Sequence, residues 1–251
     1  MIALFTDFGS DGPYTGQMKA VLWSQAPGQP VIDLFADVPP SNAKAAAYLL
    51  AAYGLGLTGV EILLCVVDPG VGSVRRALCV EAGGQWYVGP DNGTFEHVIR
   101  AELPDVTVWE ILWRPGRLSS SFHGRDVFAP VAARLTNGEQ PRESADFKLM
   151  VIDQVRRTDW PDILAEVVYI DHFGNAMCGI RCSCIDPAGY LEFDGRQIYR
   201  AETFSSVSPG EAFCYENSNG LLEIAINQGR ADEVLGLAVG TPVTLKKCLR
   251  D

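Results

Sequence analysis

Two polar segments of the sequence carry side chains that could activate a small nucleophile. In VVDPGVGSVRR, Asp68 ends an apolar run and Arg75 follows it across a turn rich in glycine and proline. In FHGRD, His123 lies in a loop beside Arg125 and Asp126. A carboxylate can orient or deprotonate water, an arginine can hold it in register, and a histidine titrates near neutral pH. The alternative is a surface Asp–Arg pair and a structural histidine, so the chemistry requires all three side chains in one place.

The N-terminal segment TDFGSDGPYTG adds two more carboxylates, Asp7 and Asp11, in a glycine-rich loop before a predicted helix. It lacks the GxGxxG pattern and the lysine of phosphate-binding loops, and its carboxylates would repel phosphate. Such carboxylates suit a cation or a neutral diol, because each can accept two hydrogen bonds from a pair of ribose hydroxyls. A capped turn without a ligand is the alternative.

The second half of the chain gives weaker signals. The segment YIDHFGN (169–175) ends an apolar run with an acid, an aromatic residue, a glycine and an amide, which alone indicates only a turn. Cys178, Cys182 and Cys184 follow His172, but their spacing fits no usual zinc knuckle. We therefore expect no metal and no cofactor.

The elements that position these residues alternate between strand and helix. We predict strands at 2–8, 31–38 and 60–68, joined by helices at 14–26 and 41–55. The helix at 41–55 is expected to start at Ser41, which follows two prolines. Near-continuously apolar strands joined by helices predict a largely parallel sheet with helices on both faces. Because ligands bind beyond the carboxyl ends of such strands, Asp7 and Asp68 should face one crevice.

The pattern changes towards the C-terminus. The runs ALCVEA and QWYVGP around Gly83-Gly84 predict a hairpin. The stretch 143–162 is charged and weakly periodic. The strands expected after it are the short β-like runs AEVVYID, YLEFD, RQIYR, AFCYEN, LLEIAIN and PVTLKK. We predict an α/β domain over residues 1–160 and a smaller, mostly antiparallel, all-β domain of barrel-like type over 161–251.

Composition limits the partners and the compartment. A net charge of −11 disfavours nucleic acid and anionic membranes and suits a small zwitterion or cation. No signal peptide is recognisable, and no apolar run reaches the ~18 residues of a membrane span. Seven cysteines, with Cys65 and Cys79 inside apolar runs, fit a reduced cytoplasmic protein.

Six segments, taken in order, resemble the motifs of one family, the SAM hydroxide adenosyltransferases or SAM hydrolases, which are related to fluorinase and chlorinase. They are TDFG…PYTGQMK, VVDPGVGSVRR, GPDNGTFE, SSSFHGRDVFAPVAARL, YIDHFGN and ENSNGLLEIAINQG. The resemblance implies an enzyme that hydrolyses S-adenosyl-L-methionine (SAM) to adenosine and L-methionine, by attack of activated water or hydroxide at ribose C5′. It also implies an α/β domain followed by a β-barrel-like domain, in a homotrimer whose substrate lies between domains of neighbouring subunits.

The resemblance assigns roles to nine residues. Asp68, Arg75 and His123 would activate the water, and Asp7 would bind the ribose hydroxyls. Phe173 and Asn175 would contact the adenine, and Asp171, Ser218 and Asp11 would hold the amino-acid end of the methionine.

Other functions remain open from the sequence. Halogenases of this family replace the triad aspartate and carry an extra loop after the region corresponding to 93–105. Here Asp68 is present and that path is short, which favours hydrolysis. The fluorinase has an arginine after the serine of the amino-acid end, whereas here Asn219 follows Ser218. A metal-dependent phosphohydrolase using the aspartates and His123, and a non-catalytic SAM- or adenosine-binding module, are the further alternatives.

Overall fold

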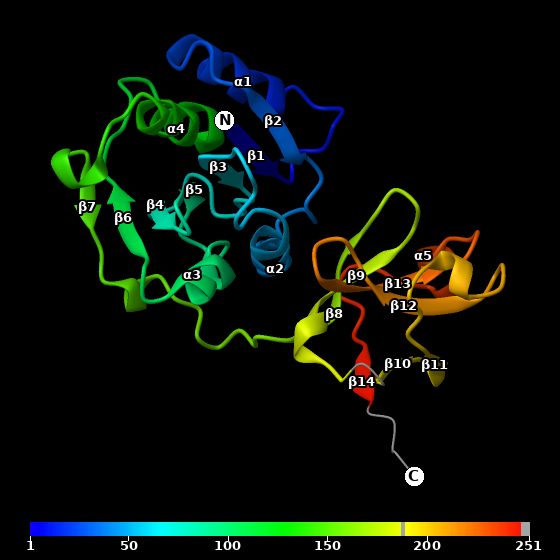
Figure 1. Ribbon diagram of the computed structural model, residues 1–251. Helices are drawn as coiled ribbons and strands as arrows, with labels where there is room; N and C mark the ends of the chain where they lie inside the picture. Colours follow the sequence, from blue (N-terminus) through cyan, green and yellow to red (C-terminus); the bar gives the residue numbers. More distant parts are fainter. Residues whose placement is uncertain (187–188, 247–251) are drawn as a thin grey trace. The chain divides into compact units, whose positions relative to one another are not determined.

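The computed structural model describes residues 1–186 and 189–246. The chain forms two compact units that divide between Thr158 and Asp159, called unit 1 and unit 2 below (Figure 1). Unit 1 is an α/β domain and unit 2 is built from antiparallel sheets, so the predicted fold class is confirmed.

Unit 1 contains one sheet, a set of helices and several short turns. Its strands are β1 (Ile2–Thr6), β2 (Val31–Phe35), β3 (Ile62–Val66), β4 (Ala77–Ala82), β5 (Gln85–Pro90), β6 (Thr107–Ile111) and β7 (Phe147–Leu149). Its helices are α1 (Tyr14–Gln25), α2 (Ala43–Tyr53), α3 (Glu96–Glu102) and α4 (Ala129–Thr136), with a π-helical turn at Gly124–Phe128 and 3-10 turns at Pro141–Glu143 and Ile152–Gln154.

The sheet of unit 1 has the strand order β2-β1-β3-β5-β4-β6-β7. The first four strands in that order are mutually parallel. Helices join β1, β2 and β3, as expected, whereas the chain reaches β5 from β3 through the antiparallel strand β4. The predicted hairpin about Gly83-Gly84 is confirmed, since β4 and β5 pair antiparallel from Ala77–Pro90 to Ala82–Gln85. β6 and β7 continue the antiparallel part. The carboxyl ends of β1 and β3 therefore lie side by side.

Helices cover both faces of this sheet. Side chains alternate between the two faces along each strand, and the apolar side chains of β1 are buried on both. On β1, Ile2 and Leu4 belong to the core that includes Met18 and Leu22 of α1 and the buried face of α4. Phe5 points the other way and contacts Phe35, which in turn contacts Tyr53 of α2. Figure 1 shows α1 and α4 on one side of the sheet and α2 and α3 on the other.

The start of α2 differs from the prediction. Asn42, not Ser41, caps the helix, and its Oδ1 accepts a hydrogen bond from Ala45 N at 2.9 Å. Ser41 has a φ of 59°, and its N–H donates to the carboxylate of Asp7. Both residue types are good caps, so the sequence could not distinguish them.

Unit 2 contains two antiparallel sheets with strand orders β12-β13-β9-β8 and β11-β10-β14. Its strands and helix are β8 (Leu164–Ile170), β9 (Ala176–Arg181), β10 (Tyr190–Phe193), β11 (Arg196–Ile198), β12 (Ala212–Glu216), β13 (Leu221–Ile226), β14 (Thr244–Lys246) and α5 (Ala231–Leu235), with 3-10 turns at Cys182–Cys184 and Phe204–Ser206. The sheets enclose one apolar core, and Cys214 of β12 exchanges backbone hydrogen bonds with Tyr199 and Ala201, just after β11.

β9 was not among the expected strands. A Cβ on its Gly179 would lie 2.7 Å from Leu164 Cβ, so the close approach of β8 requires glycine there. Glycine normally weakens strand predictions, which explains the omission.

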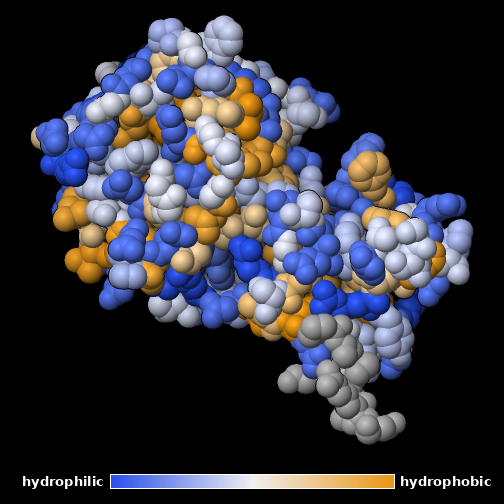
Figure 2. All heavy atoms as spheres, viewed as in Figure 1, coloured by the Kyte–Doolittle hydropathy of each residue, from blue (hydrophilic) through white to orange (hydrophobic). Residues whose placement is uncertain are grey.

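On the face of the molecule in Figure 2, hydrophobic residues are interspersed with hydrophilic ones. In the part of the chain that the structure describes, no helix is both long and apolar enough to cross a membrane.

Candidate active site

Asp68, Arg75 and His123 lie together just beyond the carboxyl end of β3. Arg75 Nε donates to Asp68 Oδ1 at 2.7 Å, and Arg75 Nη2 contacts both Asp68 Oδ2 and His123 Nδ1, the latter at 3.2 Å. The side chains of Arg75 and Asp68 are only 9% and 5% exposed. The guanidinium also lies over the ring of Phe128, 5.1 Å from its centroid. The structure thus brings the three sequence-predicted residues into one hydrogen-bonded group.

A small cavity of about 80 Å³ opens beside this group. Asp68 and His123 line it, together with Asp7, Phe8, Ser41, Val66, Val71, Ser121, Phe122 and Gly124. A cavity of this volume with polar side chains in its wall can hold water, each molecule of which needs two to four polar partners. The cavity therefore offers room for water beside a carboxylate and an imidazole.

The electrostatics of the cavity favour a neutral histidine. Burial, and next the positive charge of Arg75, lower the pKa of His123 below its ordinary value. A guanidinium has only donors, so its contact with Nδ1 requires a lone pair on that nitrogen. The neutral ring then carries its proton on Nε2, and His123 is a hydrogen-bond donor at that atom.

The loop between Asp68 and Arg75 is held tightly. Gly72 has a φ of +78°, and a Cβ there would lie 2.4 Å from the carbonyl oxygen of Ser120. The loop therefore lies against the segment before His123, at a distance that only glycine allows. That segment is fixed in turn by Asp126, which accepts a hydrogen bond from Ser119 N at 2.8 Å.

Asp7 lies at the end of β1 and lines the same cavity. Its Oδ2 accepts a hydrogen bond from Ser41 N at 2.8 Å, which accounts for the left-handed backbone of Ser41. Burial raises the pKa of Asp7, and the negative charge of Asp68 adds a smaller effect in the same direction. Asp11 is exposed, bonds to Ser10 Oγ and does not line the cavity.

Unit 2 has a separate cavity of about 690 Å³ lined by three of the predicted residues, Asp171, Phe173 and Asn175. Asp171 Oδ1 accepts from the backbone N–H groups of Phe173 and Asn175, each at 2.9 Å, and its Oδ2 accepts from Asn175 Nδ2 at 3.0 Å. Phe173 is 72% exposed, which leaves its ring face available. Ser218 is exposed in the turn after β12 and does not line this cavity.

Glu223 is a buried carboxyl that sequence reasoning missed. Its side chain accepts hydrogen bonds from the Tyr215 hydroxyl at 2.6 Å and from Asn217 Nδ2 at 3.0 Å. Burial raises its pKa above the ordinary value. The signal was present, because a glutamate interrupts the apolar run LLEIAIN, which forms a fully buried strand.

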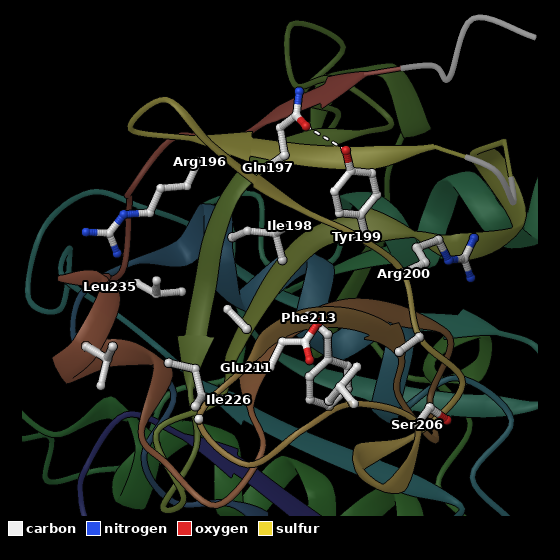
Figure 3. Close-up of a pocket in the computed structure, with 15 residues that line it drawn as sticks. Arg196, Gln197, Ile198, Tyr199, Arg200, Ser206, Glu211, Phe213, Ile226 and Leu235 are labelled. Carbon is white, nitrogen blue, oxygen red and sulfur yellow. Dashed lines mark hydrogen bonds between the residues drawn. The ribbon is translucent and has the colours of Figure 1, made fainter.

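Another cavity of unit 2, of about 610 Å³, contains none of the predicted site residues. Figure 3 shows it between Arg196 and Arg200, with Ile198, Phe213 and Leu235 among its lining side chains. Within residues 1–186 and 189–246, no three His, Cys, Asp or Glu side chains are grouped to hold a metal ion.

Comparison with known proteins gives a consistent result. The family model described as the SAM hydroxide adenosyltransferase N-terminal domain matches residues 2–145, and the corresponding C-terminal domain model matches residues 165–244. A Thermus thermophilus protein named (R)-S-adenosyl-L-methionine hydrolase is 39% identical, covering 97% of this chain and 98% of its own. An Actinoplanes fluorinase is 23% identical, covering 98% and 97% respectively. The crystal structure of an uncharacterized conserved protein from Thermotoga maritima matches with a TM-score of 0.83 at 29% identity, covering 98% of this chain and 100% of that one.

Proposed function

The chain belongs to the SAM hydroxide adenosyltransferase family, and we propose that it hydrolyses SAM to adenosine and L-methionine by attack of water at ribose C5′. Methionine leaves as a neutral thioether and needs no acid, so the demand falls on the nucleophile. The observation that carries the proposal is the small cavity lined by Asp68 and His123, with Arg75 bridging the two side chains.

The proposed roles follow from the hydrogen-bond pattern. Arg75 stays positively charged and occupies Nδ1 of His123, so the Nε2–H of the neutral ring donates to the water oxygen. Asp68 has lone pairs beyond those that Arg75 uses, and it accepts the proton of the water. The oxygen forms a bond to C5′ while the C5′–S bond breaks and its electron pair stays on sulfur. A positioned base of this kind contributes about 10²–10⁴-fold to the rate.

The substrate-binding roles are proposed from the same family pattern. Asp7, which lines the water cavity, binds the ribose hydroxyls through the lone pairs that its backbone hydrogen bonds leave free. The exposed ring of Phe173 stacks on the adenine. Asn175, which lines the same cavity and whose amide also bonds to Asp171, pairs with the polar edge of the adenine. Asp171, Ser218 and Asp11 hold the amino-acid end of the methionine.

Solvent labelling tests the reaction directly. SAM is incubated with the enzyme in ¹⁸O-water, and the adenosine is analysed by mass spectrometry. Label at the 5′ oxygen is expected, because solvent supplies the nucleophile. The same incubation with added chloride is analysed by liquid chromatography, and 5′-chloro-5′-deoxyadenosine in place of adenosine would identify a halogenase. SAM bound without any product would identify a binding module.

We also propose that the protein acts as a homotrimer, with each site formed by unit 1 of one subunit and unit 2 of its neighbour. Complementation tests this arrangement. Asp68→Ala and Asn175→Ala variants, each inactive alone, are unfolded together and refolded at equal amounts. Random assembly into rings would restore about one quarter of the wild-type activity, because half of the unit 1 copies and half of the unit 2 copies are intact. No recovery would contradict the shared site.

A cytoplasmic location is proposed on the cysteine chemistry. The cysteines of the described residues are all free thiols, and most of them are buried. Reduced cysteines in this number are typical of a reducing compartment. The net charge of −11 supports the further proposal that neither nucleic acid nor an anionic membrane is a partner.

A further inference from the structure

The motif PDNG (90–93) has no role in the chemistry described above, yet it contacts both ends of the loop that carries the acid and the arginine. Val67 immediately precedes Asp68, and Arg76 immediately follows Arg75. The backbone carbonyl groups of Val67 and Arg76 each accept a hydrogen bond from the dipeptide Asp91-Asn92, which follows β5.

Asn92 holds the first end of the loop. Its Nδ2 donates to the carbonyl oxygen of Val67 at 2.7 Å. Its Oδ1 accepts from Thr94 N at 3.2 Å and from Thr94 Oγ1 at 2.7 Å, and Thr94 is completely buried. Because both bonds from Thr94 go to the amide oxygen, they fix the orientation of the amide, and its NH₂ group faces the carbonyl of Val67.

Asp91 holds the second end. Its backbone N–H donates to the carbonyl oxygen of Arg76 at 3.0 Å, and its Oδ2 accepts from Arg76 Nε at 2.7 Å and Nη2 at 2.6 Å. The carboxylate is only 7% exposed. The Arg76 carbonyl also accepts from Arg75 Nη1 at 3.1 Å. Asp91 and the guanidinium of Arg75 therefore share one acceptor.

We propose that Asp91 and Asn92 are positioning residues that hold Asp68 and Arg75 in register with His123. The inference rests on the proposed hydrolysis, to which it adds the residues that set the geometry. Neither side chain lines the water cavity. Asn92 acts through the backbone carbonyl of Val67, and the carboxylate of Asp91 acts through the side chain of Arg76. A misplacement of about 1 Å in a catalytic group can cost about 10²-fold in rate, so such a clamp has a measurable effect.

The test uses Asn92→Ala, which removes the donor to Val67, and Asp91→Asn, which removes the charge facing Arg76. Glu96→Gln is the matched control. Glu96 is another buried carboxylate of unit 1 that joins two arginines, Arg100 and Arg156, but it makes no contact with the loop. Hydrolysis is followed by adenosine release at saturating SAM, SAM affinity by calorimetry, and folded protein by circular dichroism.

We expect each clamp variant to lose about 10- to 100-fold in kcat while the Kd for SAM changes by less than about threefold, and Glu96→Gln to keep kcat. A second readout does not depend on turnover. The ring of His123 is one of three histidines, so its titration is followed by NMR and assigned with a His123→Asn variant. Arg75 lowers the pKa of His123 and Asp68 raises it. Displacement of Arg75 in Asp91→Asn should therefore raise that pKa, and displacement of Asp68 in Asn92→Ala should lower it.

Folded clamp variants with wild-type kcat, or with lowered kcat but an unchanged His123 pKa, would overturn the proposal. If Asn92→Ala fails to fold, Asp91→Asn decides by the same criteria, since asparagine keeps the backbone bond and the volume of the side chain. Failure of the proposed hydrolysis and failure of the proposed positioning role give different results. If the wild-type protein releases no adenosine, the proposed function fails, and the His123 titration alone decides whether the motif positions Arg75.

Discussion

Replacing Asp68 with asparagine separates the two contributions of its carboxylate. Asparagine keeps the shape of the side chain but loses the negative charge that faces Arg75 and the basic oxygen that faces the cavity. The first loss affects stability and the second affects turnover. Both can be measured on the same variant.

The expected magnitudes come from the burial of the pair. Arg75 is 9% exposed, and in the variant its remaining acceptors would be the amide oxygen of residue 68, the Arg76 carbonyl and His123 Nδ1. Removing one partner of a buried ion pair costs about 3–5 kcal/mol, because the other charge stays buried without compensation. Loss of the base should lower kcat by about 10²–10⁴-fold.

The stability term is checked by urea unfolding of the full chain, followed by tryptophan fluorescence. Four of the five tryptophans, Trp23, Trp86, Trp109 and Trp113, lie in unit 1, so the signal reports mainly on the unit that holds the pair. The double variant Asp68→Asn with Arg75→Met should regain most of the lost stability while staying inactive. If Asp68→Asn is as stable as the wild type, or if its kcat falls less than about tenfold, the reasoning is refuted.

Three further predictions follow from single residues. The pKa of His123 is lowered in the folded protein, so its protonation opposes folding. The free energy of unfolding should therefore rise with pH up to about 6.5 and then level. Urea titrations of His123→Asn should show a flatter rise. Because the pKa of Glu223 is raised, stability should fall as pH rises from about 4.3 through the raised value, and Glu223→Gln should remove that fall. Gly72→Ala should lower the melting temperature and kcat more than Gly84→Ala, since both have positive φ but only Gly72 faces a backbone oxygen at 2.4 Å.

The sequence was informative wherever one periodicity dominated. The strand before Asp7, the strand before Asp68 and the hairpin about Gly83-Gly84 were predicted, because apolar runs and turn residues leave few alternatives there. The side-by-side ends of β1 and β3 then followed from parallel pairing. What stayed hidden was long-range: the close approach that requires Gly179, and the choice of Asn42 over Ser41 as the helix cap.

In the site, too, the residues could be predicted from local motifs, whereas the contacts between them could not. Motifs indicated Asp68, Arg75 and His123, but spacing alone could not show that Arg75 lies between the other two or that it occupies Nδ1 of the histidine. Asp11 and Ser218 show the limit of carrying roles over by motif, because both are exposed and neither lines a cavity with the other predicted residues. Their proposed contacts with methionine stay predictions.

The arrangement of charge around the cavity also bears on how the reaction is accelerated. Asp7 and Asp68 bring two carboxylates to one small space, and the substrate is a sulfonium cation whose charge disappears as the C5′–S bond breaks. A bare carboxylate near the sulfonium would stabilise the cationic ground state more than the transition state, which lowers both KM and kcat. Arg75 bonds both oxygens of Asp68 and offsets that charge, while lone pairs remain to accept a proton. The buried ion pair is therefore better explained by differential stabilisation of the transition state than by the stability of the fold, to which such pairs contribute little.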